Sequence, residues 1–328
     1  MGIKNFSKVL NEYAPQTNKK RIITDYKNKV IAVDTSLILY QYVSAIRNTG
    51  KDLTDNNNNS VSHIYAILQK TLSLLKKHIK PIYVFDGKAP KLKSNTIKSR
   101  KNNKNKAIEN EKNAKDEKDK IKYFKRSLII TTKQFNECKK ILDIIGIPYI
   151  QADGEADIVC AALVKQNIAY ATLSEDIDML TFGCCKLVKN LTKTNIITEL
   201  DLSDILKGLD LNNAEFIDFC ILLGCDYLDT IKGIGYKTAY KIIKEHKSIE
   251  EFIKNNSKFT IPENYDYKKV IEYFKQTDKI NIKKDKLKFN KSDVITLGKE
   301  LEKYNFNSKN INIMVNAFIN YSISSSIS

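Results

Sequence analysis

Seven acidic residues, spread along the chain in short phrases, most constrain what this sequence can fold into. Most of them follow directly or closely on an apolar run that is typical of a β-strand. In an open α/β sheet the carboxyl ends of parallel strands lie along one edge, so we expect the acids to gather there. The seven residues are Asp34, Asp86, Glu155, Asp157, Asp176, Asp178 and Asp226.

So many carboxylates cannot share a small cleft as bare anions, because like charges at close range repel each other strongly. Divalent cations would relieve that repulsion. Oxygen-only ligands suit Mg²⁺ or Mn²⁺, which keep several waters and bind phosphates. The formal net charge of the chain is +17. An acidic cluster in so basic a chain predicts two-metal chemistry on a polyanion.

Six of these acids also have an alternative interpretation. Asp34 and Asp86 could simply form turns after strands, which is a common role of Asp. Glu155 and Asp157 stand in the first turn of a predicted helix, where acids favour the helix dipole. We expect Asp176 and Asp178 to lie on one side of an extended segment, although a solvated turn is the alternative. The joint occurrence of all seven at such positions favours a metal site.

Composition narrows the remaining classes of protein. The chain has 328 residues, with 55 Lys and Arg against 38 Asp and Glu, a surplus that favours nucleic acid. An AT-rich genome, which encodes Lys, Asn and Ile frequently, is the alternative explanation. No apolar run is long enough to cross a bilayer, and the first residues lack the apolar core of a signal peptide. Six cysteines without a C-x-x-C pair indicate reduced core residues of an intracellular protein, and three histidines do not suggest a zinc centre.

Strand and helix patterns alternate along most of the chain, as a mostly parallel sheet flanked by helices requires. Strands are predicted at 30–33, 81–85, 148–150, 169–173 and 186–189, and helices from 35 through Arg47 and at 63–77, 131–145, from 154, and 213–223.

The segment 98–126 has no apolar face. It holds 12 Lys and Arg against 5 Asp and Glu, and contains neither Gly nor Pro. It is either a disordered charged loop in the free protein or a mobile basic arch that orders on DNA.

A second signal is the turn G-I-G at Gly233–Gly235, which lies between two short predicted helices. Backbone N–H groups of such a turn can bind a phosphate, with Lys237 and Lys241 beside it. The alternative is a simple turn between helices.

Several phrases, in order, resemble the flap endonucleases, which are structure-specific 5′ nucleases of the XPG superfamily. They include I-A-V-D-T-S, Y-V-F-D-G-K-A-P, D-G-E-A-D, S-E-D-I-D-M-L, L-L-G-C-D-Y and I-K-G-I-G-Y-K. The resemblance implies a nuclease core of the PIN-like type over residues 1–255, with a helical arch at 98–126 and a helix–two-turn–helix unit at 216–246. Residues 256–321 would form a divergent C-terminal part packed on or near the core, and 322–328 a disordered tail.

The resemblance also assigns roles to residues. The seven acids would bind two Mg²⁺ ions, for which Mn²⁺ could substitute, while Lys93 and Arg100 would engage the scissile phosphate. A K⁺ ion would sit at Thr230, Ile231 and Ile234. DNA would be bound by Gly2, Tyr40, Arg47, Lys70, Gly233, Gly235, Lys237 and Lys241, with a base stacked on Tyr40.

The implied substrate is branched DNA with a 5′ flap, cut during DNA replication and repair by a monomeric enzyme. The alternatives are a 5′ exonuclease or a junction- or bubble-cutting nuclease of the same superfamily, and a non-catalytic DNA-binding relative. No Q-x-x-L-x-x-F-F sliding-clamp box is present. Asp157 stands where the family commonly has Glu, which suggests a metal contact through water. The implied location is intracellular: the nucleus of a eukaryote, or the replication compartment of a large DNA virus.

Overall fold

The strands and helices fall into two compact units, each assembled from separate stretches of the chain. The computed structural model describes residues 2–191 and 196–321. Unit 1 comprises residues 1–25, 88–96 and 154–282, and unit 2 comprises residues 26–87, 97–153 and 283–328. In the described residues no helix is long and apolar enough to cross a membrane.

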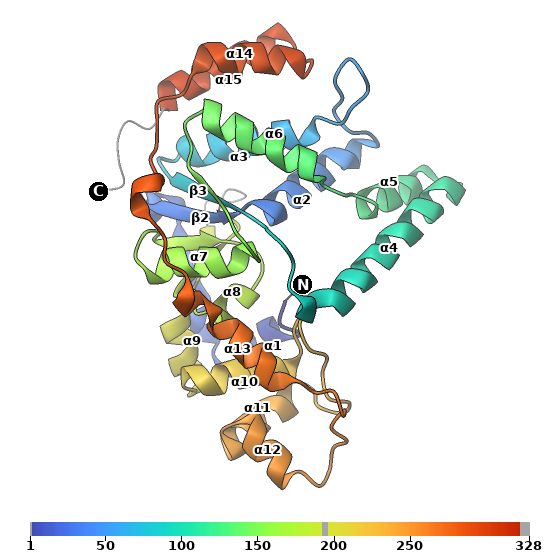
Figure 1. The fold of residues 1–328 in the computed structure, drawn as a ribbon, viewed down its shortest axis with the longest axis vertical. Helices are drawn as coiled ribbons and strands as arrows, with labels where there is room; N and C mark the ends of the chain where they lie inside the picture. The colour runs from blue at the N-terminus through green and yellow to red at the C-terminus, as the bar shows by residue number, and fades with distance from the viewer. Residues whose placement is uncertain (1, 192–195, 322–328) are drawn as a thin grey trace. The chain divides into compact units, whose positions relative to one another are not determined.

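Unit 2 contains three parallel strands covered by helices (Figure 1). The strands occur in the order β2-β3-β4, and α2, α3 and α6 pack around them. Helices α14 and α15 form a hairpin that packs on α6 and α3. The elements are β2 (Val30–Asp34), α2 (Thr35–Ile46), α3 (Ser62–Leu75), β3 (Lys80–Phe85), α5 (Glu117–Arg126), α6 (Thr132–Ile144), β4 (Tyr149–Gln151), α14 (Val294–Lys303) and α15 (Ser308–Tyr321).

Parallel strands are buried on both faces, which is why their sequences are almost continuously apolar. Residues 31–34 of β2 and 81–85 of β3 are all buried. Helix α6 begins with a reciprocal capping box, in which Thr131 accepts from the Gln134 amide and the Gln134 side chain accepts from the Thr131 amide.

Unit 1 contains four strands in the order β1-β7-β6-β5. Strands β5 and β6 are parallel, whereas β6–β7 and β7–β1 are antiparallel. The elements are α1 (Phe6–Tyr13), β1 (Lys19–Ile22), α7 (Ala156–Lys165), β5 (Ala171–Leu173), α8 (Asp178–Thr181), β6 (Lys186–Lys189), β7 (Ile196–Asp201), α9 (Leu202–Leu209), α10 (Asn213–Leu223), α11 (Tyr236–His246), α12 (Ile249–Asn255) and α13 (Tyr267–Phe274).

The mixed α/β class with a mostly parallel set of strands is confirmed, but two local predictions need correction. The segment at Asp176 and Asp178 is not extended. Ile177 has helical backbone angles and Asp178 opens α8, because the Asp176 carboxylate accepts a hydrogen bond from the Asp178 amide at 3.2 Å and turns the chain. Strands β1 and β7 were not predicted. The sequence of β1, K-K-R-I, is polar and mostly exposed, as suits an edge strand.

The basic segment 98–126 is helical in the structure. Helix α4 (Ser94–Asn113) begins in unit 1 and continues into unit 2, and Ala107 is its only buried residue. Helix α5 has none. The predicted boundary at residue 255 stays a prediction. The structure groups residues 256–282 with unit 1 and residues 283–321 with unit 2, and the predicted disordered tail 322–328 lies outside the described residues.

Candidate active site

Two of the seven acids lie at the carboxyl ends of neighbouring parallel strands in unit 2. Asp34 ends β2 and is paired in register with Val84 of β3, two residues before Asp86. The Asp34 carboxylate is buried and caps α2 by accepting from the Leu37 amide at 3.2 Å. Asp86 is exposed, and its carbonyl accepts from the Gln151 side chain at 2.8 Å. Within this unit, Asp34 and Asp86 thus lie at or just after the ends of neighbouring strands, where the sequence placed them.

The glycine after Asp86 is required by a close approach of two backbones. A Cβ at Gly87 would lie against the carbonyl oxygen of Ala152 and 2.5 Å from that of Asp153. No side chain fits there. Gly87 thus lets the segment after β3 pack directly on the segment that follows β4.

In unit 1, α7 presents Glu155 at its N-cap and Asp157 in its first turn. Glu155 is buried and has three side-chain donors. Lys93 donates to Oε1, and the hydroxyls of Tyr227 and Tyr273 donate to Oε2 at 2.6 and 2.8 Å. These contacts fix both oxygens of the carboxylate.

Lys93 also lies 3.4 Å from an Asp226 oxygen and 5.4 Å from the centre of the Tyr227 ring. Burial alone would disfavour the charged ammonium, but the neighbouring carboxylates of Glu155, Asp157 and Asp226 outweigh it and raise the pKa of Lys93. Lys93 is therefore a cation held among three acids predicted to bind metal.

The remaining acids of unit 1 crowd around Asp178. Asp178 is 1% exposed, and burial together with the charges of Asp176 and Asp226 raises the pKa of its carboxyl well above the usual range. Its Oδ1 atom has no hydrogen-bond partner within the described part of the chain. A Cβ at Gly2 would lie against Asp176 Oδ1 and 2.6 Å from Asp178 Oδ1, so the glycine backbone packs directly on both carboxylates.

These residues fit a divalent cation chemically. The donors are carboxylate oxygens, and one buried Asp178 oxygen lacks a partner among the described residues, which is costly for a polar atom. No group of three His, Cys, Asp or Glu side chains in the described residues is already arranged as a metal site. The cation beside Glu155 and Asp226 in this structure is instead the Lys93 ammonium.

The residues predicted at the arch and near the 5′ end of DNA lie in unit 2. Arg100 is half-buried on α4. The Tyr40 hydroxyl accepts from Lys104 at 3.3 Å, and the same ammonium lies 4.9 Å from the centre of the ring. Lys70 is buried, 6.0 Å from the centre of the Tyr42 ring.

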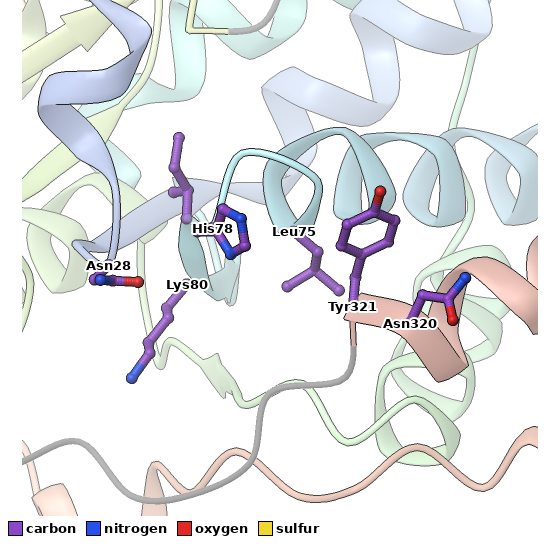
Figure 2. Close-up of a pocket in the computed structure, with 7 residues that line it drawn as sticks. Asn28, Leu75, His78, Lys80, Asn320 and Tyr321 are labelled. Atoms are coloured by element: carbon purple, nitrogen blue, oxygen red, sulfur yellow. The ribbon is translucent and has the colours of Figure 1, made fainter.

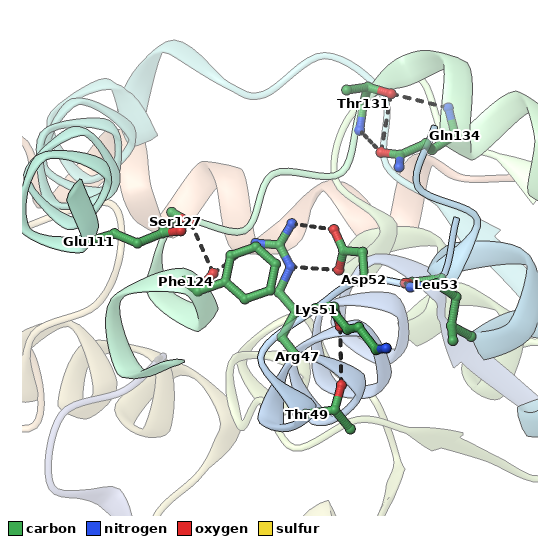
Figure 3. A network of polar contacts seen from close by, with 11 residues as sticks. Arg47, Thr49, Lys51, Asp52, Leu53, Glu111, Phe124, Ser127, Thr131 and Gln134 are labelled. Carbon is green, nitrogen blue, oxygen red and sulfur yellow. Dashed lines mark hydrogen bonds and ion pairs between the residues drawn. The ribbon is translucent and has the colours of Figure 1, made fainter. Parts of the chain in front are cut away.

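Arg47 connects the end of α2 to α5 (Figure 3). Its guanidinium donates two hydrogen bonds to Asp52, at 2.9 and 2.8 Å, and one to the Phe124 carbonyl at 2.8 Å. It also lies 4.1 Å from the centre of the Phe124 ring. Ser127 donates to the same carbonyl at 2.9 Å. In this structure Arg47 therefore holds the second helix of the basic segment.

The predicted helix–two-turn–helix unit consists of α10, the turns at 224–235 and α11. Gly233 has a left-handed φ of 88°, and Gly235 caps α11 with open space around its Cα. Ile231 and Ile234 are buried and Thr230 is half-buried. Lys237 and Lys241 are exposed on α11, where Lys237 pairs with Glu12 at 2.9 Å.

A small cavity of unit 2 lies at the opposite ends of the strands from Asp34 and Asp86. It has a volume of about 180 Å³ and is lined by residues that include Asn28, His78 and Lys80, just before β2 and at the start of β3, and Tyr321 at the end of α15 (Figure 2). None of the predicted site residues lines it.

Comparison with known proteins supports the assignment that these residues suggest. Residues 1–107 match the XPG N-terminal domain and residues 146–226 match the XPG I-region, which together define a nuclease of the XPG type. The chain is similar to Flap endonuclease 1 of Entamoeba dispar, with 43% identity over 302 residues that cover 89% of this chain and 80% of the relative. It therefore belongs to the flap endonuclease family.

Solved structures agree on the fold. The flap endonuclease-1 from Methanococcus jannaschii is 27% identical, with a TM-score of 0.71 over 94% of this chain and 98% of that one. The catalytic core of Rad2 in complex with a DNA substrate has a TM-score of 0.73 at 23% identity, over 97% of this chain and 100% of that one, which shows the fold alone. The chain is accordingly a structure-specific flap endonuclease, a hydrolase that acts on DNA, and the non-catalytic alternative is not favoured.

Sequence reasoning missed Tyr273, because residues after 252 show only weak periodicity. A signal was present: Val270, Phe274 and Thr277 recur with Tyr273 at helical spacing and are all buried. That spacing indicates a face packed on the core, although it does not name the partner.

A test of this geometry is Gly2→Ala. The added Cβ would displace the Asp176 and Asp178 carboxylates, so we expect flap cleavage to fall at least about tenfold with little loss of thermal stability. Gly183→Ala is the matched control, because Gly183 has a similar φ of 79° but no atom within 4 Å of its added Cβ. Equal activity of the two variants would show that the contact at Gly2 does not position the acids.

Proposed function

We propose that this flap endonuclease uses divalent cations, Mg²⁺ or Mn²⁺, to hydrolyse a phosphodiester at the base of a 5′ flap. The observation that carries the proposal is the crowding of Asp176, Asp178 and Asp226, with one buried Asp178 oxygen left without a partner. Three carboxylates held this close are stable as anions only beside positive charge.

The proposed ligands are the seven acids named from the sequence. Asp34 and Asp86 project from the strand ends of unit 2, and the other five belong to unit 1. When bound, two such ions supply an activated water and stabilise the leaving oxygen. Asp157, shorter by one methylene than the usual Glu of the family, would act through a bridging water.

Lys93 and Arg100 stabilise negative charge on the phosphate in this proposal. Lys93 is well prepared for that role, because the surrounding acids keep it protonated and Glu155 fixes its ammonium. Its charge is therefore available without any proton transfer at neutral pH. Exchange of its Asp226 contact for a phosphate oxygen would bring a positive charge to the reacting group.

The rest of the proposed DNA-binding surface acts on the backbone and on one base. Gly233 and Gly235 offer backbone N–H groups, and Lys237 and Lys241 add charge along α11. Tyr40 would stack on a base of the unpaired strand, and Gly2, Arg47 and Lys70 complete the predicted set. A K⁺ ion would be held beside the duplex by Thr230, Ile231 and Ile234.

We further propose that the enzyme acts as a monomer, in the nucleus where the organism is a eukaryote, and that helices α4 and α5 form the arch beside the flap. Their surplus of lysines would attract the single strand. Affinity for DNA would rest on contacts between these lysines and phosphates.

The role of the acids can be tested with Asp178→Asn. This isosteric change removes one charge from the proposed metal site, so we expect cleavage to fall to background while flap DNA binds as well as before or more tightly. Glu263→Gln, at an exposed position, makes the same charge change elsewhere. If Asp178→Asn cleaves at the wild-type rate in Mg²⁺, the metal assignment is wrong.

The polarity of cleavage can be tested on a panel of DNAs. Wild-type enzyme would be given 5′-flap, 3′-flap, bubble and four-way-junction substrates of matched length, and initial rates would be compared. We expect the 5′ flap to be cut fastest, at the junction of single and double strand. Faster cleavage of the 3′ flap or the four-way junction would contradict the proposal.

A further inference from the structure

Glu155 is held by a part of the chain far from the acidic phrases. Tyr273 lies on α13, and its hydroxyl donates to Glu155 Oε2 at 2.8 Å in a buried setting. Tyr227, next to Asp226, donates to the same oxygen at 2.6 Å. Both rings are less than a tenth exposed, so water does not readily replace either donor.

The Tyr273 ring is itself fixed by aromatic packing. Its centroid lies 5.0 Å from that of Tyr227 and 5.7 Å from that of Phe182, and Phe274 lies 5.1 Å from Phe182. Such packed rings have few alternative rotamers. The hydroxyl is therefore presented to Glu155 from a rigid base.

The residues that follow α13 also contact the other end of α7. The Gln166 side chain donates to the Ile280 carbonyl at 2.6 Å and accepts from the Ile282 amide at 3.3 Å. Lys165 pairs with Asp278. Residues 267–282, which we call the α7 brace, thus contact α7 at its C-terminal end and Glu155 at its N-cap. A helix held at both ends cannot easily rotate or slide.

We propose that Tyr273 is a positioning residue for Glu155 and that the α7 brace is part of the catalytic apparatus. This rests on the catalytic role of Glu155 under the proposed function. Lys93 and the two tyrosines leave the Glu155 carboxylate one orientation, and the tyrosine donors orient it as outer contacts orient metal ligands in general. Loss of one donor would let the carboxylate turn away from its productive position.

The test compares two hydroxyl deletions in the full chain. Tyr273→Phe removes the donor and keeps the packed ring. Tyr265→Phe is the control, because the Tyr265 hydroxyl is buried in the same unit and has no hydrogen-bond partner among the described residues. Single-turnover cleavage of a 5′ flap, DNA affinity, Mn²⁺ affinity by calorimetry and thermal unfolding would be measured for both.

We expect Tyr273→Phe to lower the cleavage rate and the Mn²⁺ affinity about tenfold each, with DNA affinity unchanged. Tyr265→Phe should match the wild type in cleavage rate and in Mn²⁺ affinity. Since Tyr273 acts through Glu155, adding Tyr273→Phe to Glu155→Gln should slow cleavage no further. Wild-type rates in Tyr273→Phe, equal losses in the two Phe variants, or a full further loss in the double variant would overturn the proposal.

The catalytic role of Glu155 and the positioning role of Tyr273 have separate tests. Wild-type turnover in Glu155→Gln would remove the catalytic role of Glu155 and, with it, the positioning role of Tyr273. An impaired Glu155→Gln beside a fully active Tyr273→Phe would remove only the positioning role.

Discussion

The arrangement of unit 1 depends on how buried carboxylates are kept close together. Asp178 is buried with Asp176 and Asp226 nearby, and burial together with the repulsion of their charges raises the pKa of its carboxyl. Half-buried Lys93 supplies positive charge beside them and is held by Glu155 and Asp226. Three parts of the chain pack around these charged groups: the first residues, the start of α7 and the turn at Asp226.

The close packing of these charged groups explains why small residues and hydroxyl groups surround the acids. Gly2 leaves room for two carboxylates where any side chain would displace them. The Thr96 hydroxyl donates to the Asp226 carbonyl at 2.7 Å and so anchors the start of α4 to the acidic turn. The start of α4 is therefore joined to the turn at Asp226 by the same short segment that carries Lys93.

Much of the fold was predictable from the sequence, because buried apolar residues recur with the periodicity of a helix or form the apolar run of a strand. Strands β2, β3 and β6 and helices α3, α6 and α10 lie within one or two residues of their predicted ranges. The places of Asp34 and Asp86 after neighbouring strands were predictable, because an apolar run precedes each of them. Other features leave no such signal. The edge strand β1 is polar, the turn that brings Asp178 onto α8 depends on one Asx hydrogen bond, and α4 is helical without an apolar face.

The contact from Tyr273 was the hardest feature to foresee. It joins Glu155 to a residue 118 positions away, which lies outside the two matched domain regions. Periodicity could indicate that α13 buries one face, but only coordinates identify a hydroxyl that meets a carboxylate. The position of the Glu155 side chain therefore depends on a segment that motif comparison leaves out.

The most direct measurement is a crystal structure of the protein grown with Mn²⁺, in which anomalous scattering locates the ion. The account predicts a strong anomalous peak in contact with Asp178 and its neighbouring carboxylates, with the Asp178 Oδ1 atom coordinated. Anomalous peaks only at exposed acids such as Glu263, with Asp178 uncoordinated and Lys93 still between Glu155 and Asp226, would contradict it.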